Sequence, residues 1–174
     1  MALQIEPFNS KHHNRLAFEC GVESLDRYLR FTANQDLKKK IATVFVLVNS
    51  LNKDIVAYYT LSSYTVEITE LDNSLAKRLP RYPLLPATLL GRLAVDKNYR
   101  GQRLGELMLI DALKKSLVAT EKVASLAVIA EAIDEKAVSF YQRYGFRSFS
   151  SREMKLYMTM QSIKELCQSE GLLD

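Results

Sequence analysis

The spacing of hydrophobic and polar positions along the chain predicts an alternation of strands and helices. Runs rich in β-branched and aromatic residues predict strands at residues 2–6, 42–48, 55–62, 87–95 and 123–130, and a last hairpin at 146–149 and 154–160. Apolar residues at helical spacing predict helices at residues 9–18, 24–40, 74–79, 104–119, 134–144 and 161–171. This order predicts a mixed α/β fold with a largely antiparallel first half and a parallel pair of strands around the helix at 104–119.

The length of 174 residues is typical of one domain, and no linker rich in proline, glycine or serine divides the chain. We therefore expect one folded domain at residues 1–160, followed by a helical C-terminal tail at residues 161–174. The hydrophobic fraction of 48% and the charged fraction of 25% are ordinary for a globular protein.

The two cysteines, Cys20 and Cys167, lack the spacing of metal ligands, so we expect no metal site. The first residues lack a signal-peptide pattern, and no stretch reaches the roughly 18 apolar residues of a membrane helix. These features predict a cytoplasmic protein that does not enter the membrane.

Positive charge is concentrated in one part of the chain. The whole chain has a net charge of +4, whereas residues 74–106 alone carry +5, from seven basic and two acidic residues. The basic residues are Lys77, Arg78, Arg81, Arg92, Lys97, Arg100 and Arg103. This distribution indicates a polyanionic ligand, although a solvated basic surface is the alternative.

Residues 90–106 are predicted to run from a strand through a turn into a helix. Backbone amides at a helix N-terminus bind anions, and Gly101 and Gly105 allow a ligand to approach the backbone. Arg100 and Arg103 add positive charge. The turn matches neither a Walker A loop nor a GxGxxG turn. It predicts a phosphate site, with a basic helix N-terminus that binds no ligand as the alternative.

Residues 100–105, RGQRLG, resemble the pyrophosphate loop of the GNAT acetyltransferases, R/Q-x-x-G-x-G/A, with Arg103 in place of the middle glycine. Downstream, residues 137–146, AVSFYQRYGF, resemble the family pattern A-x-x-F-Y-x-x-x-G-F. The resemblance covers roughly residues 5–160. It implies the GNAT fold, whose central parallel pair of strands splays apart to bind acetyl-CoA, and it implies N-acetyltransferase activity without a metal.

The same resemblance implies a set of contacts to acetyl-CoA. They are Leu93, Ala94, Val95, Arg100, Gly101, Gln102, Arg103, Leu104, Gly105, Glu106, Ala137 and Phe140. Tyr141 matches the family tyrosine that protonates the departing thiolate. A thiol pKa of about 8.5 and a phenol pKa of about 10 allow that transfer. A packing role is the alternative for Tyr141 and the expected role for Tyr144.

The strand at residues 88–95 carries no carboxylate that could deprotonate an amine, and Asp96 lies at its far end. Either water or another group takes the proton, or the amine needs no base. An α-amine has a pKa of about 8, roughly two units below lysine, so part of it is free base at neutral pH. The missing carboxylate therefore argues against lysine or an aliphatic polyamine as the acceptor.

Residues 18–29, FECGVESLDRYL, resemble the opening F-x-C-G-x-x-x-L-[ND]-x-[WY]-L of GNAT toxins from bacterial toxin–antitoxin modules, and residues 90–96, LGRLAVD, are typical of that group. This resemblance implies acetylation of the α-amino group of aminoacyl-tRNA, which blocks translation. It also implies a ribbon-helix-helix antitoxin as partner and a homodimer.

Four basic residues, Lys77, Arg78, Arg81 and Arg92, are candidates for contacts to tRNA phosphates. Two other functions stay open. One is a GNAT enzyme that acts on small amines or protein N-termini, which shares the same cofactor site. The other is a non-catalytic nucleic-acid-binding protein, against which Tyr141 argues.

Overall fold

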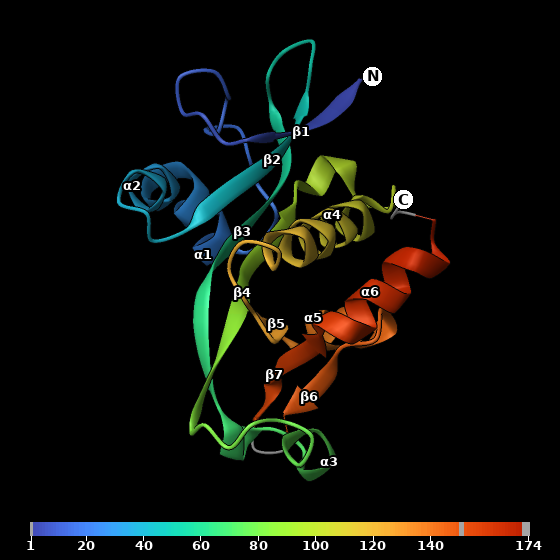
Figure 1. Cartoon of the computed structure of the whole chain (residues 1–174). Coiled ribbons are helices and arrows are strands. Elements are labelled where there is room, and N and C mark those ends of the chain that lie inside the picture. The colour runs from blue at the N-terminus through green and yellow to red at the C-terminus, as the bar shows by residue number, and fades with distance from the viewer. Residues whose placement is uncertain (1, 150–151, 172–174) are drawn as a thin grey trace. The chain divides into compact units, whose positions relative to one another are not determined.

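The structure is a computed structural model that describes residues 2–149 and 152–171 (Figure 1). Within these residues, seven strands form one sheet in the order β1-β2-β3-β4-β5-β7-β6. The strands are β1 Leu3–Pro7, β2 Thr43–Asn49, β3 Ile55–Glu67, β4 Leu84–Val95, β5 Ala127–Glu131, β6 Arg147–Phe149 and β7 Arg152–Thr159. The pairs β1–β2, β2–β3, β5–β7 and β6–β7 are antiparallel, whereas β4 and β5 are parallel. The predicted mixed sheet is therefore confirmed.

Helices form in five of the six segments where they were predicted, all except residues 9–18. The α-helices are α1 Glu23–Arg27, α2 Ala33–Lys38, α3 Asn73–Ala76, α4 Leu104–Ala119, α5 Glu135–Arg143 and α6 Met160–Ser169. Short helices of other types are the π-helix η1 Tyr28–Thr32 and the 3-10 helices η2 Ile68–Glu70 and η3 Lys97–Tyr99. The predicted helix at residues 24–40 is thus α1, η1 and α2 in succession, with a wider π turn in the middle.

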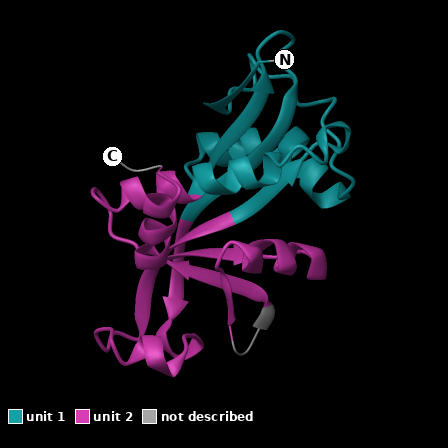
Figure 2. Cartoon of the chain, turned by 90° about the vertical axis from the view of Figure 1, so that its right-hand side faces the viewer, with its two compact units in different colours: residues 1–62, 91–112 teal, residues 63–90, 113–174 magenta. Residues whose placement is uncertain are grey.

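The chain divides into two compact units, which Figure 2 shows in different colours. Unit 1 consists of Met1–Ser62 and Gly91–Ala112, and unit 2 of Ser63–Leu90 and Leu113–Asp174. The cut passes through β4 after Leu90, so Gly91–Val95 belong to unit 1. The predicted division into a domain at residues 1–160 and a tail stays a prediction.

The core of unit 1 lies between the helical segment of residues 23–38 and the sheet, and Figure 1 shows α1 and α2 beside β2. Val44, Val46 and Val48 occupy alternate positions of β2, so their side chains lie on the same face, and all three are buried. Leu29 and Ala33, four residues apart on the helical segment, pack in the same cluster. Alternation in the strand and helical spacing in the partner segment therefore build one apolar core.

The predicted helix at residues 9–18 is wrong, because this segment forms turns and loops. The Asn9 amide donates to His13 Nδ1 at 3.0 Å, and the Asn9 side-chain oxygen accepts from the Lys11 amide at 3.0 Å. Asn14 instead bonds to the loop before β3 through Lys53 and Ile55. Side chains that bond to nearby backbone compete with a helix, and the apolar spacing did not reveal this competition.

Unit 2 has its own core, in which β5 is central. Four of its five residues, Ala127 to Ala130, are buried, as a strand covered on both faces requires. Ala127 and Ile129 pack with Leu85 of β4 and Tyr157 of β7. The predicted strand began too early at residue 123, and Val123 is 75% exposed. α5, which carries the candidate general acid, contacts β7 of this unit.

Candidate functional site

The predicted phosphate turn lies between β4 and α4 in unit 1. Asp96 caps the short helix η3 by accepting from the Asn98 amide at 2.9 Å, and Arg100 to Arg103 then lead into α4. Gly101 has a φ of +79°, and a Cβ added there would meet no atom within 4 Å. The backbone conformation therefore favours glycine, and the open backbone fits the close approach of a phosphate.

Arg103 stands where the family pattern has its middle glycine, and its backbone adopts a left-handed conformation with φ of +59°. This is the region that glycine enters without strain. At Arg103 the turn therefore adopts a conformation that a glycine would adopt without strain. The exposed Arg103 side chain forms an ion pair with Glu106, Nε to Oε2 2.8 Å, over the first turn of α4.

The Arg100 side chain turns toward the segment at residues 18–21. Its Nη2 donates to the carbonyl oxygen of Cys20 at 2.6 Å. Gly21 follows with φ of +92°, and a Cβ on Gly21 would lie 2.7 Å from the same Nη2. Gly21 therefore leaves room for Arg100, and the Cys20-Gly21 pair is structurally linked to the phosphate turn.

Asp96 strengthens this link from the other side. Its carboxylate accepts from the Glu19 amide at 3.0 Å, while the Lys97 amide donates to the Glu19 carbonyl at 2.8 Å. Asp96 is 5% exposed, and each of its oxygens already accepts a backbone N–H. This buried carboxylate holds the turn in place through bonds to backbone amides on both of its sides.

The parallel pairing of β4 with β5 joins Thr88, Leu89 and Leu90 to Val128, Ile129 and Ala130. β4 then continues through the predicted pantetheine contacts Leu93, Ala94 and Val95. Ala94 is buried in the core of unit 1, whereas Leu93 and Val95 are half-buried. Two of these three predicted residues therefore keep accessible atoms, and the Ala94 side chain packs inward.

The second motif lies on α5 in unit 2. Asp134 caps the helix by accepting from the Ala137 amide at 2.8 Å. One helical turn later, the half-buried Phe140 contacts Tyr141 and Tyr144, with ring centroids 5.4 and 5.2 Å apart. The helix ends before Gly145, which has φ of +104°. The cap, the aromatic residues and the glycine all match the predicted arrangement.

Tyr141 is buried, with 5% of its surface exposed, and its ring packs against Phe146 at 5.2 Å. Burial raises the pKa of the Tyr141 phenol above its ordinary value of about 10. The phenol therefore keeps its proton at neutral pH. Among the described residues its hydroxyl has no hydrogen-bond partner, so this proton is available for donation.

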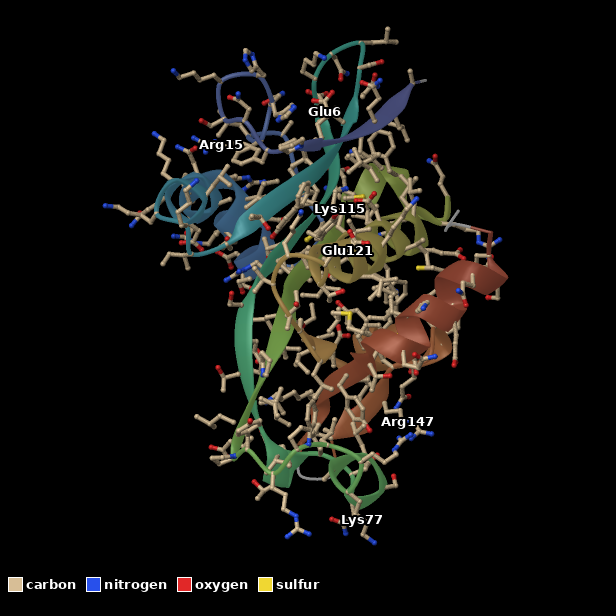
Figure 3. The ribbon with its side chains drawn as sticks, in the orientation of Figure 1. Glu6, Arg15, Lys77, Lys115, Glu121 and Arg147 are labelled. Atoms are coloured by element: carbon tan, nitrogen blue, oxygen red, sulfur yellow. The ribbon has the colours of Figure 1, made fainter. Side chains whose placement is uncertain are left out.

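The four basic residues predicted to bind tRNA divide between the units. Lys77, Arg78 and Arg81 are exposed in unit 2, and Figure 3 shows Lys77 at the end of α3. Arg92 belongs to unit 1, where its guanidinium carbon lies 3.5 Å from the ring centre of Tyr28. A stacked, half-buried arginine is held in a fixed orientation, so Arg92 differs from the three exposed residues.

Sequence patterns did not single out Arg147 on β6. Together with Arg78 it lines a pocket in unit 2. It lies outside the basic stretch at residues 74–106, and only the fold brings the two arginines to one pocket.

Along residues 2–149 and 152–171, no cluster of three or more His, Cys, Asp or Glu side chains could hold a metal ion. No helix in the same part of the chain is long and apolar enough to span a membrane.

Comparison with known proteins identifies the family. Residues 40–148 match the family described as acetyltransferase (GNAT) domain. A protein of Sinorhizobium fredii described as probable toxin TacT is 24% identical over 169 residues, which cover 93% of each chain. A tRNA-acetylating toxin of Mycobacterium tuberculosis is 27% identical, over 86% of this chain and 88% of the relative.

Two solved structures are similar over almost their whole length. The toxin AtaT in complex with acetyl-methionyl-tRNAfMet has a TM-score of 0.88 and 29% identity, over 95% of this chain and 99% of that chain. A tyrosine-to-phenylalanine variant of AtaT, bound to acetyl-CoA and to the C-terminus of the antitoxin AtaR, has a TM-score of 0.81 and 26% identity, over 94% and 97% of the chains. Because the family match spans more than half of the sequence, the chain belongs to the GNAT acetyltransferase family.

Proposed function

We propose that this N-acetyltransferase is a toxin that transfers the acetyl group of acetyl-CoA to the α-amino group of aminoacyl-tRNA and so blocks translation. The observation that carries the proposal is the similarity to AtaT, which extends over 95% of this chain and whose solved complex contains acetyl-methionyl-tRNA. The similarity to the tRNA-acetylating toxin of Mycobacterium tuberculosis supports the same substrate class.

The phosphate turn fits the pyrophosphate of acetyl-CoA. We assign this contact to the open backbone at Gly101 and to the amides of Leu104, Gly105 and Glu106, which begin α4. Gln102 and the Arg103 backbone complete the turn. Arg100 stays a predicted contact of acetyl-CoA, and its guanidinium also holds the Cys20 carbonyl. We assign it the positioning of the turn.

The remaining predicted contacts would act along the rest of the cofactor. Leu93, Ala94 and Val95 of β4 would supply backbone groups to the pantetheine arm, and Ala137 and Phe140 of α5 would pack against it. Acetyl-CoA supplies the thioester that is cleaved. Tyr141, a phenol that is protonated at neutral pH, donates a proton to the departing sulfur.

The amine must be unprotonated when it attacks the thioester. β4 offers no carboxylate, and both oxygens of Asp96 are occupied by backbone amides. An α-amine with a pKa of about 8 needs no strong base near neutral pH, whereas a lysine does. The site chemistry therefore favours an aminoacyl ester over a lysine side chain.

The partners follow from the same proposal. Lys77, Arg78, Arg81 and Arg92 would contact phosphates of the tRNA. An antitoxin would bind the chain, as AtaR binds AtaT. That this antitoxin has a ribbon-helix-helix fold, that the toxin is a homodimer and that it acts in the cytoplasm stay predictions.

Labelled acetyl-CoA offered with competing acceptors tests the proposal. The acceptors are charged tRNA, uncharged tRNA, charged tRNA with a blocked α-amine, small amines and a peptide with a free N-terminus. We expect label on charged tRNA alone. Label on small amines or the peptide, and none on charged tRNA, would favour the alternative function. Transfer to the blocked or uncharged tRNA would contradict an α-amine acceptor.

A further inference from the structure

A pocket of about 420 Å³ opens within unit 2, and none of the residues assigned to acetyl-CoA lines it. The end of α3, the start of β6, the end of β7 and the first turn of α6 supply its walls. Arg78 and Arg147 line it together with Tyr157 and the hydroxyl-bearing Ser74 and Ser162. Figure 3 shows Arg147 on β6 with its side chain directed away from the ribbon.

The charge of this pocket is positive. Neither Arg78 nor Arg147 forms an ion pair with any residue in the described part of the chain. Arg78, in the turn that follows α3, donates from Nε to the carbonyl oxygen of Ser74 in that helix at 3.2 Å, which restrains the side chain beside α3. The two terminal nitrogens of its guanidinium are then left for a ligand. Both arginines are exposed, so an anion can reach them from solvent.

The Asp72 carboxylate contacts one of the residues that line the pocket. The buried Tyr157 hydroxyl donates to Asp72 Oδ2 at 2.7 Å. Burial and this bond to Asp72 raise the pKa of Tyr157, while the nearby positive charge of Arg147 opposes the rise. One carboxylate offsets at most one of the two guanidinium groups, so the positive charge of Arg78 and Arg147 exceeds the negative charge of Asp72.

We propose that this pocket binds a backbone phosphate of the RNA substrate, an inference that depends on the proposed function. A guanidinium group matches phosphate oxygens with two parallel N–H donors, and serine hydroxyls donate to the same oxygens. Contacts of these types make up most protein contacts to nucleic-acid backbones. Lys77 adds charge at the adjoining end of α3.

Binding of a short RNA hairpin, followed without acetyl-CoA, tests the pocket independently of catalysis. Arg78→Gln and Arg147→Gln each remove one charge from an exposed side chain, and Lys122→Gln, at an exposed position outside the pocket, is the matched control. We expect each arginine variant to weaken binding about tenfold and to reduce the salt slope by about one. The control should bind like the wild type.

The same variants, assayed on charged tRNA, should raise KM for tRNA and leave kcat and KM for acetyl-CoA unchanged. Wild-type binding of RNA in both arginine variants, with an unchanged salt slope, would overturn the pocket assignment. So would a loss of affinity for an acidic antitoxin peptide without any loss for RNA. If the wild type binds the hairpin through the two arginines but does not acetylate charged tRNA, the proposed function fails while the phosphate pocket stands.

Discussion

Arg100 Nη2 donates a hydrogen bond to the carbonyl oxygen of Cys20 across 2.6 Å, although 80 positions separate the two residues in the chain. This bond connects the segment typical of GNAT toxins with the turn that resembles the family's pyrophosphate loop. Asp96 makes a second connection through the Glu19 amide. The segment at residues 18–21 therefore holds the predicted phosphate turn in its conformation.

Gly21→Ala tests this connection. A Cβ at Gly21 is strained by φ of +92° and would displace Arg100 Nη2, which lies 2.7 Å away. We expect the free energy of unfolding to fall by about 1–2 kcal/mol and the affinity for acetyl-CoA to decrease. Chemical denaturation and titration with acetyl-CoA measure the two effects.

Gly101→Ala is the matched comparison for stability, because φ is +79° but no atom lies within 4 Å of the added Cβ. It should show the strain without the displaced arginine, and hence a smaller loss of stability than Gly21→Ala. Equal losses in both variants would mean that the Arg100–Cys20 bond adds nothing measurable.

Arg103→Gly should relieve the left-handed strain at φ of +59°. Arg103→Ala keeps that strain and, like Arg103→Gly, removes the ion pair with Glu106, so the two variants differ only in the backbone effect. We expect Arg103→Gly to be more stable than Arg103→Ala by about 0.5–1 kcal/mol in urea denaturation. A less stable glycine variant would show that the turn relaxes to an unstrained conformation in solution.

Tyr141→Phe removes the proposed proton donor and keeps the buried ring. Transfer should slow about a hundredfold or more, while the affinity for acetyl-CoA is retained. Tyr144→Phe is the control, since Tyr144 is half-buried and contacts Phe140 only through its ring. Single-turnover rates compare the two variants. A fast Tyr141→Phe enzyme together with a slow Tyr144→Phe enzyme would transfer the acid role to Tyr144.

The raised pKa of the buried Tyr28 predicts how the free energy of unfolding changes at alkaline pH. Burial, followed by the hydrogen bond to Asp36, raises the pKa of Tyr28 to about 12, against the opposing charge of Arg92. Because the folded pKa exceeds the unfolded value of about 10, this contribution to stability is complete below pH 10 and is lost between pH 10 and 12. Tyr28→Phe should lose less stability than the wild type over that range. Parallel curves from pH-dependent urea denaturation would contradict this assignment.

The spacing of apolar residues predicted those helices and strands whose formation depends mainly on neighbouring residues in the sequence. The helix at residues 104–119 was predicted at its observed bounds, because its apolar spacing and the preceding turn agree. The turn geometry at Arg103 could not be predicted from its residue type, since the surrounding chain imposes the left-handed conformation. Long-range contacts escaped prediction for a related reason: the Arg100–Cys20 bond joins residues that only the fold brings together.

The central claim is that the acetyl group reaches the α-amine of an amino acid esterified to tRNA. Its most direct test is mass spectrometry of the amino acid released by mild base from charged tRNA, after incubation with the enzyme and acetyl-CoA. We expect an N-acetylated amino acid with the wild type and a strongly reduced yield with Tyr141→Phe. Unmodified amino acid after wild-type treatment, with acetyl-CoA bound by the same enzyme preparation, would contradict it.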